Sequence, residues 1–298
     1  MKITAYYMIL NEEDWIDLSI KSIYPVVDEI IIVEGATQYA KFMSNEKGLS
    51  IDRTEERINT INDCSDKIKY FQIGFVDTMI DLKNFCLQKV SEDTDYIIIL
   101  SGDEIYSASE LENLFSFARQ TDFNIFSVNH YLFFKSPCEL IHHSEPMVFK
   151  KIYKYFPDME YKEKSCDIEI SFGERKKPIH FSYCNLYHFS FVKSKMRLLM
   201  KELWYLNFLI DIKKDYFGYA RYDEIKDLSL KEKIELILRT NILFQEEYKW
   251  GILSYEGEMP FKKEIFKRYE EIKNKEKEEN IWDLILTTKK HQQEEFNK

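Results

Sequence analysis

The stretch from Tyr96 to Glu104 most constrains how this chain can fold. Five large apolar residues, Tyr96–Leu100, run without a break and are followed at once by Ser-Gly-Asp-Glu. A short apolar run that ends in a turn signal predicts a strand buried on both faces, as in a parallel sheet. Ligands of open α/β sheets bind at the carboxyl ends of the strands, so Asp103 and Glu104 are expected at that edge. From these residues alone, two interpretations stay open: a site for a hard divalent cation, and an N-cap for the next helix.

Strands and helices are predicted to alternate along the first 120 residues. Apolar runs predict strands at 3–10, 30–33, 69–73 and 96–100. Helical spacing of apolar residues is found at 15–23, 54–61, 79–90 and 109–118. Further strands are expected at 123–134 and 147–156. This alternation predicts an α/β fold, Rossmann-like, with a mostly parallel sheet flanked by helices.

The character of the chain changes after residue 191. Apolar residues fall into helical stripes at 196–206 and 230–243, and the end, 262–298, is a charged, helix-like tail. We therefore expect two parts, an α/β domain at 1–190 and a helical C-terminal extension at 191–298. The extension is a candidate surface for a partner or for a homo-oligomer.

Charge and cysteine content argue against several classes of protein. The 298 residues carry a formal net charge of −10, which disfavours a nucleic-acid partner because phosphate backbones are held mainly by Lys and Arg. A phosphorylated small molecule needs only local positive charge. The five cysteines have no CxxC spacing, which argues against a zinc cluster and a disulfide framework.

The expected location is the cytoplasm. The first residues lack the basic-then-apolar pattern of a signal peptide. No apolar run reaches the roughly 18 residues that a membrane helix needs, so we expect no transmembrane segment. A peripheral position at a membrane stays open.

A set of short segments occurs in a characteristic order. They are Met8–Glu13, Ser22–Tyr24, Val27–Thr37, Lys83-Asn84, Ile99–Glu104, and Leu186–Phe189 with Lys193 and Met196. Together they resemble family 2 glycosyltransferases of the GT-A fold, as ordered landmarks over residues 3–200. The chain departs from the family pattern at three positions: Glu34 stands where Asp is usual, Lys83 where Arg is usual, and Ser101 where the first Asp of the DxD motif is usual.

The resemblance implies a glycosyltransferase, inverting and dependent on a divalent cation, Mn²⁺ or Mg²⁺. It would move a sugar from a nucleotide-sugar donor, most often a UDP-sugar, to an acceptor hydroxyl. The acceptor could be a carbohydrate, a lipid-linked molecule or a protein. The candidate donor-binding residues are Leu10, Asn11, Glu12, Glu34, Gly35, Lys83, Ser101 and Gly102. The ordinary alternative for Lys83 is a solvated helix lysine.

Three residues are candidate metal ligands. Asp103 is the first choice, with Glu104 as an orienting group, because a metal that bridges two phosphates stabilises a diphosphate leaving group. His188 is a further candidate, since imidazole suits manganese-like ions. Its alternative is a core histidine between two aromatic residues. His142 and His143 are disfavoured as a chelating pair because neighbours on a strand point to opposite faces.

An inverting transfer also needs a general base for the acceptor hydroxyl. Asp167 is the first candidate, with Glu169 and Glu145 as alternatives, and for any one of them an ordinary surface acid in an acidic protein is the simpler interpretation. The aromatic residues of 123–156 and the Trp204-Tyr205 pair could stack on a sugar, although such residues are more often part of a core.

A second hypothesis is a non-catalytic GT-A-like domain with a binding or scaffolding role, because Ser101 lacks the charge of a complete DxD motif. A nucleotidyltransferase of related fold is a third and weaker hypothesis, because Asn11-Glu12-Glu13 stands where a glycine-rich phosphate loop would be expected.

Overall fold

The computed structural model describes residues 1–141, 148–164, 167–171, 178–216, 220–241 and 251–278. Its strands are β1 (Ile3–Ile9), β2 (Glu29–Thr37), β3 (Ile68–Val76), β4 (Tyr96–Leu100), β5 (Glu104–Tyr106), β6 (Ile125–Phe134), β7 (Ser136–Ile141), β8 (Val148–Lys154), β9 (Glu160–Lys164), β10 (Asp167–Ser171), β11 (Ile179–Phe191) and β12 (Ile252–Ser254). Its helices are α1 (Ile16–Ile23), the short 3-10 helix η1 (Gln38–Met43), α2 (Thr54–Asn59), α3 (Met79–Lys89), α4 (Ala108–Ala118), α5 (Lys195–Asp211), α6 (Tyr222–Ile225), α7 (Leu230–Thr240) and α8 (Lys262–Glu278).

The first four strands form a parallel sheet in the order β3-β2-β1-β4. The chain builds β1, β2 and β3 outward in one direction and then returns to place β4 on the other side of β1. The strand order therefore reverses between β1 and β4, which is where sheets of this kind leave a crevice at the carboxyl ends. The predicted α/β class, with a mainly parallel sheet flanked by helices, is confirmed.

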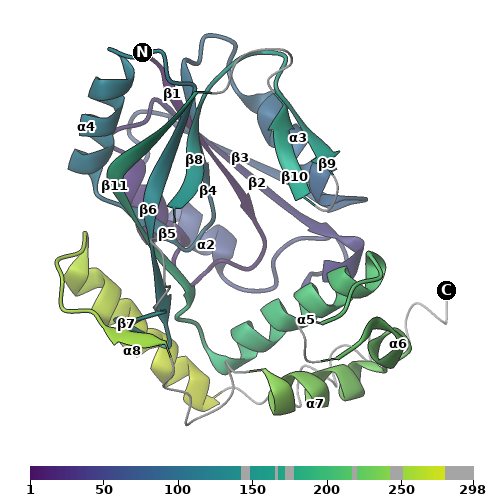
Figure 1. Cartoon of the computed structure of the whole chain (residues 1–298). Coiled ribbons are helices and arrows are strands. Elements are labelled where there is room, and N and C mark those ends of the chain that lie inside the picture. Colours follow the sequence, from purple (N-terminus) through teal and green to yellow (C-terminus); the bar gives the residue numbers. More distant parts are fainter. Residues whose placement is uncertain (142–147, 165–166, 172–177, 217–219, 242–250, 279–298) are drawn as a thin grey trace.

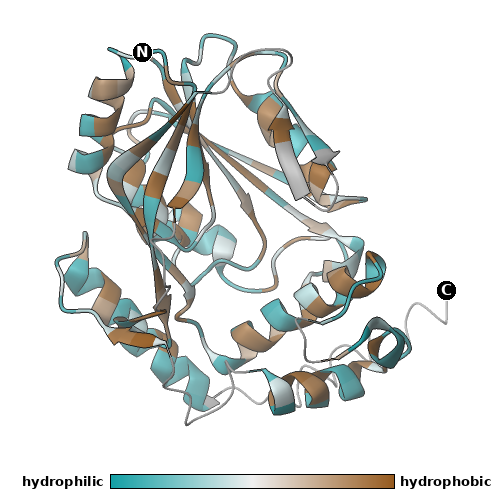
Figure 2. Ribbon diagram, viewed as in Figure 1, coloured by the Kyte–Doolittle hydropathy of each residue, from teal (hydrophilic) through white to brown (hydrophobic). Residues whose placement is uncertain are grey.

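Both faces of this parallel sheet are buried, which is why its strands read as continuous apolar runs. Tyr6 and Tyr7 are neighbours on β1 and point to opposite faces. Tyr7 lies in a core cluster with residues of α1 and α4, whereas Tyr6 lies in a second cluster with Leu82 and Cys86 of α3. The central strands are largely apolar in Figure 2, and α8 is largely polar.

An antiparallel half extends the sheet beyond β4, through β8, β6, β7 and β12. Strand β11 runs parallel to β6 and antiparallel to the short β5. The pairing of β11 with β5 sets His188 opposite Glu104, and the Phe189 amide donates to the Asp103 carbonyl at 2.9 Å. A strand from late in the chain is thereby fixed beside the end of β4.

In Figure 1, α5, α6 and α7 lie at one end of the sheet, and α8 lies beside β7. Helices α5 and α7 share one apolar cluster, and α8 joins another that includes Trp15 and Phe189. The helices predicted at 196–206 and 230–243 correspond to α5 and α7, and the charged tail forms α8 up to Glu278. Among the described residues, no helix combines the length and apolar character that membrane crossing requires. The division at residues 190 and 191 stays a prediction.

Candidate functional site

A cavity of about 310 Å³ opens at the carboxyl ends of β1, β2 and β4, at the point where the strand order reverses. Its walls come from the strand ends, from α3, from the end of β11 and from α5. The lining residues are Met8, Ile9, Leu10, Asn11, Glu12, Gly35, Thr37, Ala40, Met43, Met79, Leu82, Ser101, Asp103, His188, Ser190, Lys193, Arg197, Met200, Lys201, Trp204 and Tyr205. Strand β4 therefore delivers Asp103 to the edge that its sequence predicted.

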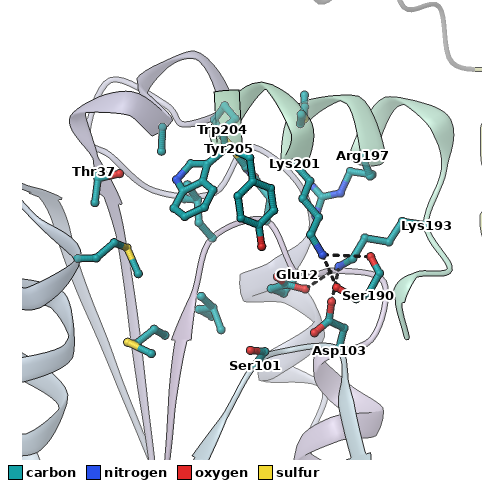
Figure 3. A pocket seen from close by; sticks show the side chains of 18 of the residues that line it. Glu12, Thr37, Ser101, Asp103, Ser190, Lys193, Arg197, Lys201, Trp204 and Tyr205 are labelled. Carbon is teal, nitrogen blue, oxygen red and sulfur yellow. Dashed lines mark hydrogen bonds and ion pairs between the residues drawn. The ribbon is translucent and has the colours of Figure 1, made fainter. Parts of the chain in front are cut away.

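A lysine bridges two carboxylates in the wall of this cavity (Figure 3). The Lys193 Nζ lies 3.0 Å from Glu12 Oε2 and 3.2 Å from Asp103 Oδ2. The side chains of Lys193 and Asp103 are each only 6% exposed. Burial alone would lower the pKa of Lys193, but the two carboxylates outweigh it and raise that pKa above its usual range.

The two carboxylates respond differently to the same burial. Burial raises the pKa of Glu12, and Lys193 offsets only part of that effect. Burial also acts on Asp103, but there Lys193 and His188 prevail and hold the pKa of Asp103 well below its usual range. Of the two carboxylates, Asp103 therefore keeps its negative charge to a lower pH than Glu12 does.

A chain of two histidines extends from the other oxygen of Asp103. His188 Nε2 lies 3.1 Å from Asp103 Oδ1, and His188 Nδ1 lies 2.7 Å from His130 Nε2. His188 therefore links Asp103 at the cavity to His130 on β6. Both oxygens of Asp103 are thus engaged by side chains of the protein.

Two further cations of α5 enter the cavity. Lys201 donates to the hydroxyl and the carbonyl of Ser190, and its Nζ lies 4.8 Å from the centre of the Phe191 ring. Burial lowers the pKa of Lys201, although the Asp103 carboxylate opposes that effect. Arg197 lies 2.8 Å from the Asp52 carboxylate and is 8% exposed.

The turn after β1 owes its shape to Asn11. This residue has a φ of 57°, in the left-handed region that Asn tolerates better than most residues. Its side chain accepts from the Ile51 amide at 2.8 Å and donates to the Met43 carbonyl at 2.5 Å. These bonds tie the turn to the segment after β2, so that Glu12 is held in the cavity wall.

Most of the predicted donor-binding and metal-binding residues meet in this cavity. Leu10, Asn11, Glu12, Gly35, Ser101, Asp103 and His188 all line it. Gly102 lies directly behind, because an added Cβ there would be 2.7 Å from the Cβ of Glu12. Their donor-binding and metal-binding roles stay predictions, but all of these residues lie at the same cavity.

Besides Gly102, three of the predicted donor-binding and metal-binding residues are outside the cavity lining, as far as the described residues define it. Glu34 accepts from the Ser50 amide at 2.7 Å and from the side chains of Tyr70 and Gln72. Lys83 lies over the ring of Tyr161 at 5.0 Å, and burial, followed by the charge of Lys151, lowers its pKa.

Glu104 is the third of these residues. Its carboxylate oxygen Oε1 accepts from the Lys151 ammonium at 2.5 Å, and Oε2 accepts from the Ser101 amide at 3.0 Å. Its side chain therefore contributes to the support of the β4 turn rather than to the cavity wall.

The candidate bases are only partly placed. Asp167 and Glu169 belong to β10, which pairs with β9 in a separate two-stranded sheet. Glu145, with His142 and His143, lies outside the described residues. The assignment of a general base stays a prediction.

The fit of these residues to a divalent cation can be judged from their contacts. Among the described residues, no three His, Cys, Asp or Glu side chains are grouped to hold a metal ion. Asp103 has one oxygen on His188 and the other on Lys193, which also holds Glu12. The Lys193 ammonium thus occupies the position at which a metal would bind Asp103. In this arrangement the residues do not fit a metal ion.

Comparisons with known proteins gave structural likeness only. No family model matches the chain, and no curated protein matches it. It is similar in structure to S. aureus TarS 1-349 in complex with UDP, with a TM-score of 0.42 and 13% identity over 80% of this chain and 70% of that chain.

The same S. aureus fragment in complex with UDP-GlcNAc matches with a TM-score of 0.42 and 12% identity, over 80% of this chain and 71% of that one. Glucosyl-3-phosphoglycerate synthase from Mycobacterium tuberculosis, in complex with Mn²⁺, UDP and phosphoglyceric acid, has a TM-score of 0.31 and 18% identity, over 44% and 43% of the two chains.

Sequence reasoning missed the cations of the cavity. Arg197 and Lys201 are four residues apart on one face of α5, and Lys193 directly precedes the N-cap Ser194 of that helix. The spacing of Arg197 and Lys201 is a signal in the sequence, but the apolar stripe of the same segment predicts only a helix. Lys193 enters only through the family resemblance.

Proposed function

We propose that this protein is a glycosyltransferase that binds the diphosphate of a nucleotide-sugar donor in the cavity at the ends of β1, β2 and β4. The observation that carries the proposal is the charge of the lining. Lys193 lies between Glu12 and Asp103, and Arg197 pairs with Asp52, whereas Lys201 lines the same cavity with no carboxylate at ion-pair distance among the described residues. A chain with a net charge of −10 thus presents an ammonium group that an anionic ligand can neutralise, at the place where an α/β sheet binds its ligand.

The walls of the cavity suit the rest of such a donor. Apolar side chains of Met8, Met79 and Leu82 line one part, and the aromatic residues Trp204 and Tyr205 line another. Aromatic rings can stack on a base or on the apolar face of a sugar. Ser101 offers a neutral hydroxyl that can bond a ribose.

In the proposed reaction, the acceptor oxygen attacks the anomeric carbon while the bond from that carbon to the diphosphate oxygen breaks. The electron pair of the broken bond stays on the diphosphate, and the proton of the acceptor hydroxyl passes to a carboxylate base, for which Asp167 is the first candidate. An inverting outcome belongs to this proposal through the sequence resemblance.

Thermal denaturation with nucleotides tests the proposal directly. UDP, GDP, CDP and dTDP are added separately to the full chain, each beside its nucleoside. A ligand that binds only the folded state stabilises it by about 2.7 kcal/mol at a concentration of 100 Kd. At least one diphosphate should raise the melting temperature while its nucleoside does not. The absence of any shift would refute the proposal.

A non-catalytic binding role is the competing hypothesis, and the neutral Ser101 in the lining favours it. Both hypotheses predict the thermal shift. They differ in turnover, because a transferase slowly hydrolyses its bound donor when no acceptor is present. Release of diphosphate from the UDP-sugar that binds, abolished in Lys201→Met, would exclude the purely binding role.

A further inference from the structure

The ammonium group of Lys193 occupies the space between the carboxylates of Glu12 and Asp103. Two acidic side chains converging on one cation are what a divalent metal would need. Here the two carboxylates are already neutralised by the Lys193 side chain. An ammonium group has three donors, and two of them are used by these carboxylates. The third remains for a ligand in the cavity.

Lys201 adds a second cation whose contacts are neutral. It bonds to Ser190 and lies over the ring of Phe191. Among the described residues, no carboxylate is within ion-pair distance of it. A partly buried ammonium without a counter-ion is costly, and an anion in the cavity would relieve that cost. Because Lys201 lines the same cavity as Lys193, one diphosphate could contact both.

We propose that Lys193 and Lys201 take the place of a divalent cation, so that this protein binds and releases a nucleoside diphosphate without a metal. The inference rests on the proposed function and concerns the same cavity. As the bond to the sugar breaks, the negative charge that develops on the diphosphate oxygen is met by two fixed ammonium groups. Lys193 in turn is held in position by Glu12 and Asp103.

Isothermal titration of the full chain tests this inference. UDP, GDP, CDP and dTDP are titrated in buffer with EDTA and, separately, with Mn²⁺. The expected result is the same Kd in both buffers for the diphosphate that binds. Lys201→Met should weaken that binding about tenfold or more, the loss of one charge-assisted contact. Lys195→Met is the matched control, since Lys195 is exposed on the same helix and should leave Kd unchanged.

Lys193→Met gives a second and sharper readout. It should abolish binding in EDTA and regain it with Mn²⁺, because the freed carboxylates of Glu12 and Asp103 then offer oxygen ligands to the metal. If this variant does not fold, the Lys201→Met result decides alone.

The possible outcomes separate the two proposals. Binding by the unaltered protein only in the presence of Mn²⁺ would overturn the inference and leave the proposed function standing. Undiminished binding by Lys201→Met in EDTA would also overturn the inference. No binding of any diphosphate in either buffer would overturn the proposed function itself.

Discussion

Gly102 shows how a single missing side chain shapes the cavity. It lies between Ser101 and Asp103, and an added Cβ would be 2.7 Å from both Cβ and Cγ of Glu12. Those atoms are close to the backbone and cannot swing aside as the end of a long side chain can. Any larger residue at this position must therefore displace Glu12, which is one of the two carboxylates that hold Lys193.

Gly102→Ala should consequently damage both stability and binding. We expect a loss of about 1–3 kcal/mol in the free energy of unfolding, the usual cost of overpacking. We also expect weaker diphosphate binding, because Lys193 loses part of its support. Urea denaturation and titration calorimetry measure the two effects. A variant as stable as the parent and with the same Kd would show that Glu12 does not depend on this close approach.

The position of Asp103 at the edge of the sheet could be predicted from the sequence, because a strand end followed by a carboxylate is a local feature. The partner of Asp103 could not be predicted, since Lys193 is brought there by packing, and Glu12 and Lys193 are 181 residues apart. The direction of the Glu104 side chain could not be predicted either. This side chain leaves the cavity wall because of the turn at Gly102 and Asp103 and because of Lys151, which is 47 residues away in the sequence.

At the scale of elements, α8 is anchored to α1 by one buried ion pair. Arg268 donates to both carboxylate oxygens of Asp17, at 2.9 and 3.1 Å, and to the carbonyls of Glu13 and Asp14. The two side chains are 9% and 6% exposed. The C-terminal helix thereby fixes the segment that follows Glu12, which lines the cavity.

Arg268→Met should remove this anchor and destabilise the protein by about 3–5 kcal/mol, because it leaves Asp17 buried without its main partner. The double variant Asp17→Asn with Arg268→Met should recover part of that loss. Chemical denaturation of the parent and the variants at pH 7 measures both values. A loss below about 0.5 kcal/mol, typical of an exposed pair, would show that α8 is held mainly by its apolar contacts.

The same ion pair predicts a dependence on pH. Burial would raise the pKa of Asp17, but Arg268 outweighs burial and lowers it. A lowered pKa contributes stability that is complete above the unfolded value of about 3.9 and is lost as the pH falls through the folded value. The stability difference between the parent and Asp17→Asn should therefore be constant from pH 7 to about pH 5 and shrink below about pH 4. A difference that persists unchanged to about pH 3 would contradict the assignment.

Elements with local signals were predictable, and elements defined by distant pairing were not. The strands β1, β2, β3 and β4 and the helices between them follow from apolar runs and helical spacing. The antiparallel β5 and β12 are short, and their partners β11 and β7 lie far away in the sequence. For the charged tail, composition indicated a helix but gave no sign that Arg268 would be buried under α1.

At the scale of the whole molecule, the cavity depends on two parts of the chain that are far apart in sequence. The strand ends contribute Glu12 and Asp103, and the segment from β11 into α5 contributes His188, Lys193 and Lys201. The parallel sheet could be predicted, and so could the edge at which a ligand would bind. The second wall could not, because its position depends on β11 pairing with β5 and β6.

This division predicts where a bound nucleotide should slow amide hydrogen exchange. Exchange follows local opening, and a ligand held by both walls opposes the opening of each. The diphosphate that binds should therefore protect residues 8–12 and 101–103 together with residues 188–205. The pairing of β7 with β12 lies away from the cavity lining and should exchange unchanged. Exchange measured by mass spectrometry with and without the nucleotide provides the comparison. Protection confined to the strand ends would mean that α5 does not hold the ligand, and the roles proposed for Lys193 and Lys201 would then fail together.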